Sequence, residues 1–230
     1  MTGSDHLRIA QYLIQQAQQS GPGEVDWDRF EKSCSIAQQL LAEANDSIPT
    51  WNIDLLRLSA IALRGKSVSP DVLQATLVKR CNELSEAFPD DLECQERLII
   101  FLKSNAPSAD SESLWGRLQN INPDHPALAI RQFERMLIEG QAGAEKFLED
   151  FYEKHPDPAV RRRMISHASL RGRWDDVERY TTGGRKNNEV DSDELLQTCD
   201  LLLLAPPDPV NGNSPEDRGS QRQQWLDQIA

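Results

Sequence analysis

The stretch PDHPALAIRQFERMLIEGQAGAEKFLEDFYEKHPDP, residues 123–158, decides the fold of this chain. Its prolines frame two segments whose apolar residues recur at helical spacing. Pro89 lies 34 residues before Pro123, and Pro156 lies 33 residues after it. A helix-breaking residue at one phase of such a period is typical of stacked helix–turn–helix repeats. Repeat arrays usually offer binding surfaces, so the period favours an interaction protein.

Amphipathic segments of the same kind continue towards both ends of the chain. The expected helices cover residues 4–19, 26–41, 51–65, 70–88, 92–102, 114–121, 128–137, 147–151, 160–168, 174–180 and 191–205. No two-residue alternation is long enough to indicate a sheet. We therefore predict an all-α fold, a right-handed α-solenoid of about five antiparallel helix hairpins with a C-terminal capping helix. Residues 4–205 form the expected repeat domain, and residues 206–230 a proline-containing linker with a short terminal helix.

Composition narrows the classes of partner. The chain of 230 residues has a net charge of −12, and an acidic surface repels phosphate backbones. Nucleic acid is therefore not expected as a partner. The longest apolar run, residues 201–205, is too short to cross a membrane. No apolar leader opens the chain, and we predict a soluble, cytoplasmic protein.

The four cysteines do not have the spacing of a metal site. Zinc ligands usually come in pairs two to four residues apart, whereas Cys81 and Cys94, the nearest pair, are 13 apart. Each cysteine falls on the apolar side of an expected helix, where a thiol packs as a small hydrophobe. We expect Cys34, Cys81, Cys94 and Cys199 to be inert core residues, which fits a reducing compartment.

The segment Gly172-Arg173-Trp174-Asp175-Asp176-Val177, followed by Tyr180, resembles the turn and second helix of tetratricopeptide repeats. Residues 26–30 form a weaker copy, residues 140–144 keep the turn glycine, and residues 105–109 keep only the length of the turn. The resemblance covers about residues 4–181. It implies a superhelix with a concave groove lined by the first helix of each pair. The residues expected in that groove are Glu93, Glu96, Lys103, Ile130, Glu134, Arg162, Ser166 and Ser169.

The run Arg161-Arg162-Arg163, with Arg171 and Arg173 nearby, is the one marked basic cluster in the sequence. Arginine forks pair bidentately with carboxylates and phosphates, so the cluster is a candidate anion site. The alternative is a solvated helix face paired with nearby aspartates. Successive helical residues point about 100° apart, so all three arginines cannot line one site.

Nothing in the sequence assembles a catalytic centre. The four histidines, His6, His125, His155 and His167, form no metal or nucleophile motif, and no phosphate-binding glycine loop occurs. The acid pairs 90–91 and 175–176 are expected to stabilise helix N-termini. The first helices also lack the lysine–arginine pair with which some tetratricopeptide domains clamp terminal carboxylates. We expect neither catalysis nor a cofactor.

Five tryptophans complete the candidates. Trp27, Trp51, Trp115 and Trp174 are expected to pack in the core, whereas Trp225 is either a docking anchor or a partner contact in the tail. The function expected from the whole sequence is a non-catalytic scaffold or adaptor that binds a peptide or partner protein in its groove. The alternatives are a regulatory subunit of an enzyme complex, an enzyme with a site hidden between repeats, and a nucleic-acid-binding helical repeat.

Overall fold

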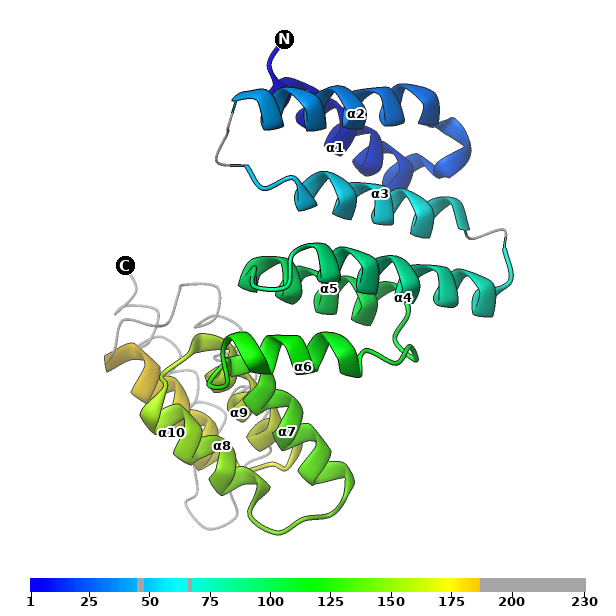
Figure 1. Cartoon of the computed structure of the whole chain (residues 1–230). Helices are drawn as coiled ribbons and strands as arrows, with labels where there is room; N and C mark the ends of the chain where they lie inside the picture. Colours follow the sequence, from blue (N-terminus) through cyan, green and yellow to red (C-terminus); the bar gives the residue numbers. More distant parts are fainter. Residues whose placement is uncertain (45–47, 66–67, 187–230) are drawn as a thin grey trace, which may run out of the picture. The chain divides into compact units, whose positions relative to one another are not determined.

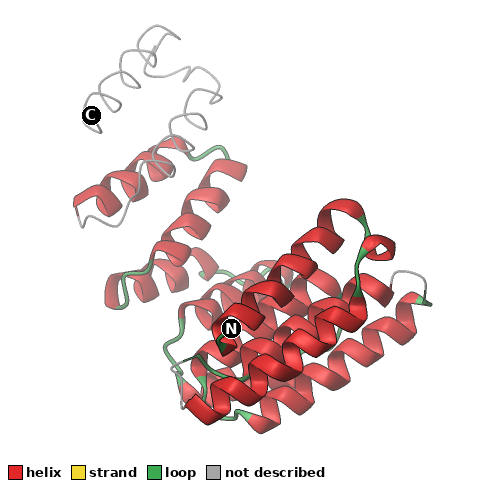
Figure 2. Cartoon of the chain, turned by 90° about the horizontal axis from the view of Figure 1, so that it is seen from above, coloured by secondary structure: helices red, strands yellow, loops and turns green. Residues whose placement is uncertain are grey.

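A computed structural model describes residues 1–44, 48–65 and 68–186 of the chain, and this part is entirely helical (Figures 1 and 2). It contains no strand and ten α-helices: α1 Gly3–Ser20, α2 Trp27–Ala44, α3 Trp51–Arg64, α4 Pro70–Ala87, α5 Leu92–Asn105, α6 Glu112–Ile121, α7 Pro126–Ile138, α8 Ala144–Lys154, α9 Pro158–Leu170 and α10 Trp174–Lys186. The all-α prediction is confirmed for these residues. The expected helix 191–205 and Trp225 lie outside them.

The helix boundaries follow the prolines and the capping residues. Pro89, Pro123 and Pro156 lie in the turns before α5, α7 and α9, as the period predicts. Asp91 caps α5 by accepting a hydrogen bond from the Cys94 N–H at 2.9 Å. The carboxylate of Asp157 does the same for α9, at 2.8 Å from the Ala159 nitrogen. These side chains satisfy amide donors that the first turn of a helix leaves unpaired.

The chain divides into two compact units, Met1–Pro123 and Asp124–Ala230. The first unit holds α1 to α6, which stack in chain order (Figure 1). Its helix α3 contacts α1 and α5, the first helices of the neighbouring pairs, as well as α2 and α4. A core of buried side chains joins α1, α2 and α3 and includes Leu13, Phe30, Cys34, Ile53 and Ala60.

A buried amide joins the second and third pairs of the first unit. Gln95 of α5 is fully buried, and its Nε2 donates to the carbonyl of Phe88 at 2.8 Å. The hydroxyl of Ser85 in α4 donates to Gln95 Oε1 at 2.6 Å. Because each buried polar atom has a partner, this joint stabilises one packing of α4 against α5.

The second unit repeats one hairpin at an offset of 32 residues. Its helix α7 contacts α8 and α9, and α9 contacts α8 and α10. Pro126 and Pro158 open α7 and α9, while Gly140 and Gly172 follow their ends with φ of 66° and 69°. Buried side chains of the helices α7, α8 and α9, among them Phe133, Leu148 and Val160, form the core.

The described cysteines and helices agree with two further expectations. Cys34, Cys81 and Cys94 are buried free thiols, and Cys199 lies outside the described residues. Burial raises the pKa of Cys34 to about 11 and those of Cys81 and Cys94 to about 12, so all three remain protonated. None of the helices in the described ranges is long and apolar enough to cross a membrane.

Candidate binding site

The predicted groove residues occupy matching positions on the first helices. Counted from the N-cap residues Asp91, His125 and Asp157, they fall at the second, fifth, ninth or twelfth position of α5, α7 and α9. These steps of three or four residues follow one face of a helix. The face is most open on α5 and α9, where Glu93, Lys103, Arg162 and Ser166 are exposed.

On α7 the same face is more enclosed than the sequence indicates. Ile130 is half-buried and packs against the core of the second unit. Glu134 is also half-buried, and its carboxylate lies 3.2 Å from Arg163 Nε of α9. Glu96 and Ser169 are half-buried as well. This ion pair therefore holds two neighbouring first helices together.

An exposed apolar residue on this face escaped the sequence reasoning. Ile100 occupies the ninth position after Asp91, between Glu96 and Lys103, and is 59% exposed. Its apolar neighbours in the sequence hid it, because four consecutive large apolar residues, 98–101, blur the helical period. The first helices also expose Tyr12, Ile138 and Leu170. Their position in the pair, not the local sequence, is the signal that marks Ile100.

The basic run does not form one site. Arg161 is fully buried, Arg162 is exposed, and Arg163 packs over the Phe133 ring at 5.6 Å while pairing with Glu134. Arg173 points towards α8 and binds Glu145 at 2.7 Å. The prediction that the three successive arginines diverge is confirmed. The description of the run as a solvated face is wrong for Arg161, which lies in the interior.

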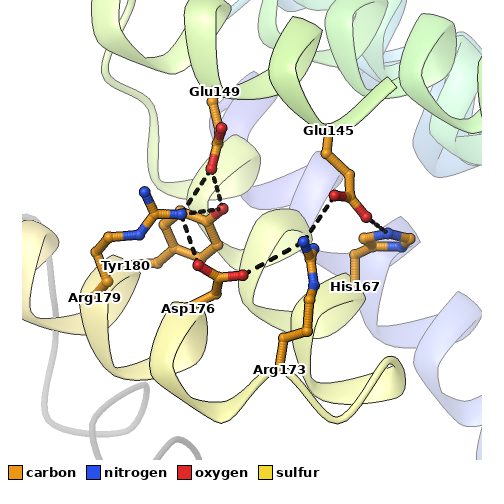
Figure 3. Close-up of polar contacts among 7 residues, drawn as sticks. All are labelled: Glu145, Glu149, His167, Arg173, Asp176, Arg179 and Tyr180. Carbon is orange, nitrogen blue, oxygen red and sulfur yellow. Dashed lines mark hydrogen bonds and ion pairs between the residues drawn. The ribbon is translucent and has the colours of Figure 1, made fainter. Parts of the chain in front are cut away.

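A network of charged side chains connects α8, α9 and α10 in the second unit (Figure 3). Glu145 of α8 lies 2.9 Å from His167 Nε2 of α9, and its other oxygen accepts from Arg173. Glu149 accepts from Arg179 at 2.8 Å and from the Tyr180 hydroxyl. Asp176 joins the two halves because its two oxygens bind Arg173 and Arg179 separately (Figure 3).

The network has the electrostatics of a structural link. Burial of the Glu145 carboxyl opposes ionisation, but the hydrogen bond from His167 and the charge of Arg173 outweigh it and lower its pKa. Burial and the bond to Glu149 raise the pKa of Tyr180. The cavity beside Glu145 and His167 measures about 10 Å³, which is at the lower limit for one water molecule. A substrate cannot enter there, so the network ties the last helices together.

The largest space with apolar walls lies in the first unit, between α2, α3 and α4. This cleft has a volume of about 430 Å³. Its apolar lining comprises Leu58, Ala60, Ile61, Leu84, Ala87 and Phe88, and its charged lining Glu31, Asp54, Arg57, Arg64, Arg80 and Glu83. None of the predicted groove residues lines it, and the sequence reasoning missed it, since a gap between helices depends on their spacing.

Arg57 is the best-fixed charge at this cleft. Its guanidinium donates to Asp54 at 3.0 Å, to Gln38 at 2.9 Å and to Glu31 at 3.3 Å. Partial burial disfavours its charge, but the bonds to Asp54 and Glu31 outweigh this effect and raise its pKa. Arg80 binds Glu83 at 2.9 Å, and Arg64 lies over the Trp27 ring at 5.5 Å. The charged rim is therefore held in place before any ligand arrives.

The other candidates have structural places in the fold. Trp51 and Trp115 are buried, whereas Trp27 and Trp174 are only half-buried. His125 caps α7, and Asp175 and Asp176 lie in the first turn of α10. Among the residues that the structure describes, no three histidine, cysteine, aspartate or glutamate side chains gather as metal ligands do.

Comparison of this chain with models of known protein families, with curated proteins and with solved structures found no match. The geometry of the described residues is therefore the evidence from which a function is inferred.

Proposed function

We propose that this protein is a non-catalytic interaction scaffold, a tetratricopeptide-like α-solenoid that holds a peptide or partner protein on its first-helix face. This face is defined by Glu93, Glu96, Ile100 and Lys103 on α5 together with Ile130, Glu134, Arg162, Ser166 and Ser169 on α7 and α9. The α5 and the α7–α9 parts belong to different units, and each part is a binding surface in the proposal.

One observation carries the proposal: the same positions after three successive N-caps bear side chains that are open to solvent or only half-covered. A repeat that presents equivalent positions on consecutive helices offers a partner a row of evenly spaced contacts. On α5 this row combines two carboxylates and an ammonium group with exposed Ile100. Mixed polar and apolar chemistry of this kind suits a protein ligand.

The helix pairs themselves support the likeness to tetratricopeptide repeats. The segment 172–177 forms a turn with Gly172 at positive φ, followed by α10, whose Val177 is fully buried. Gly140 occupies the equivalent place before α8. In the proposal the two units continue as one right-handed superhelix.

Affinity capture from native lysate tests the proposal. The intact full-length chain is compared with a variant reversed at three groove positions, Glu93→Lys, Glu96→Lys and Arg162→Glu. A control variant, Glu43→Lys, Lys154→Glu and Glu178→Lys, makes the same net charge change at exposed positions of second helices. We expect a partner that the intact chain and the control retain and the groove variant loses. A partner that all three retain, or no partner at all, would contradict the first-helix face.

A further inference from the structure

We propose a second binding site, separate from the first-helix face: the cleft between α2, α3 and α4 receives an amphipathic helix of a partner protein, with a lysine or arginine beside its apolar stripe. The site is the space of about 430 Å³ whose apolar residues are Leu58, Ala60, Ile61, Leu84, Ala87 and Phe88. A volume in this range is typical of ligand sites, which are concave, mostly apolar and edged by a few fixed polar groups.

The lining favours a helix over an extended peptide. Every wall of the cleft is an α-helix, whose backbone groups are already bonded within the helix. An extended segment entering the cleft would therefore bury amide groups without partners, at a cost of a few kcal/mol each. A helical segment satisfies its own backbone and contributes only side chains, which is the chemistry that apolar walls accept.

The length of the cleft also fits a helix. On α3 the lining runs from Asp54 to Arg64, ten residues, which correspond to about 15 Å at the helical rise. A partner helix presents apolar side chains at positions i, i+3 or i+4, and i+7 over about 10 Å. Three such side chains fit between the flanking helices and meet Leu58, Ile61 and Leu84.

The charges at the rim select a basic neighbour for that apolar stripe. Glu31 and Asp54 share the single cation Arg57, which leaves one negative charge in excess around it. Each carboxylate uses one oxygen for Arg57, and the other oxygen takes no bond from the described residues. Arg80 and Glu83 already neutralise each other. A lysine or arginine at this end of the helix therefore complements the rim.

A pair of designed peptides tests this assignment on the full-length chain. Both are amphipathic helices of the same length with leucines at i, i+4 and i+7; one has flanking lysines and the other has glutamates at the same places. Fluorescence anisotropy measures their binding. We expect the lysine peptide to bind at least tenfold more tightly than the glutamate peptide, with a difference that shrinks in high salt.

Substitutions in α4 locate the binding. Ala87 lines the cleft and Ala75 does not, yet both are exposed alanines of the same helix. The side chain of Ala87→Trp fills the cleft and should weaken the lysine peptide at least tenfold, whereas Ala75→Trp should leave its affinity within about twofold. Glu31→Gln should reduce the preference for lysine, and Glu43→Gln, in the same helix, should not.

Three outcomes would overturn the proposal. Equal affinity for the two peptides would remove the charge selection, and an equal loss in Ala87→Trp and Ala75→Trp would place the binding elsewhere. Absence of peptide binding, while Ala87→Trp still abolishes binding of the apolar dye 8-anilinonaphthalene-1-sulfonate, would assign the cleft to a small molecule instead of a helix.

Discussion

At the scale of single residues, the fold depends on buried polar groups that find partners across helix pairs. Gln95 shows this most directly, because its amide bonds Ser85 in α4 and the carbonyl of Phe88. Gln95→Ala removes both partners and leaves a small cavity. The variant should lose about 2–3 kcal/mol of unfolding free energy in urea titrations.

The control for this substitution is Gln119→Ala, which truncates an exposed glutamine of α6 in the same unit. Its unfolding free energy should change by less than about 0.5 kcal/mol. A loss of similar size in the two variants would mean that the amide of Gln95 has no special place in the joint between α4 and α5.

Glu145 makes the stability of the second unit depend on pH. Its pKa lies below the ordinary value of 4.5, so ionised Glu145 stabilises the folded state. This contribution is complete above the ordinary value and is lost as pH falls through the lower folded value. Glu145→Gln should cost about 1 kcal/mol at neutral pH, because the charged bonds from His167 and Arg173 are weakened.

The difference between the parent chain and Glu145→Gln should narrow as the pH falls below 4.5. Chemical denaturation at a series of pH values measures it, with Glu153→Gln, an exposed glutamate of the same helix, as the control. If the difference stayed constant over that range, the network would not be electrostatic in origin.

Sequence reasoning reaches only some of these residues. The burial of the cysteines follows from the helical period, and the capping role of Asp91 and Asp157 from their place before a helix. The bonds of Glu145 with His167 and Arg173 join residues 22 and 28 positions apart. Such pairs depend on how helices are rotated against each other, which a local pattern does not determine.

At the scale of elements, glycines at equivalent helix ends test the repeat. Gly172 has φ of 69°, and the N–H of the following residue bonds back to the carbonyl of Ala168. A side chain in this left-handed conformation costs about 1 kcal/mol. Gly172→Ala should therefore lower the unfolding free energy by about that amount.

Gly116 is the matched glycine inside a helix. It lies in α6, and an added methyl group would meet no atom within 4 Å. Gly116→Ala should therefore raise the unfolding free energy by about 0.5–1 kcal/mol, since alanine favours the helix. Thermal unfolding followed by circular dichroism measures both glycine variants. Stabilisation by both substitutions would contradict the assigned end of α9.

The element boundaries were the most predictable part of the structure. Pro70, Pro126 and Pro158 stand at the first position of α4, α7 and α9, where a missing N–H does no harm. The cleft was not predictable, because it depends on the separation of α2 and α4 over α3. Ile100 also escaped, since a run of apolar residues does not show which one faces solvent.

At the scale of the whole molecule, the period in the sequence predicted consecutive helix pairs, and the contacts of the described helices agree with stacked hairpins. The period contains no information about the partner, because a repeat needs only its core positions to fold. The proposed scaffold function therefore depends on which face a partner touches.

Site-specific photo-crosslinking tests this central claim most directly. A benzophenone amino acid replaces Ile100 or Ser166 on the first-helix face, or Asn120 on α6, all exposed positions. The full-length chain is then irradiated in native lysate. The account predicts an adduct of defined mass from Ile100 or Ser166 and none from Asn120. Adducts from Asn120 alone, or from none of the three positions, would contradict it.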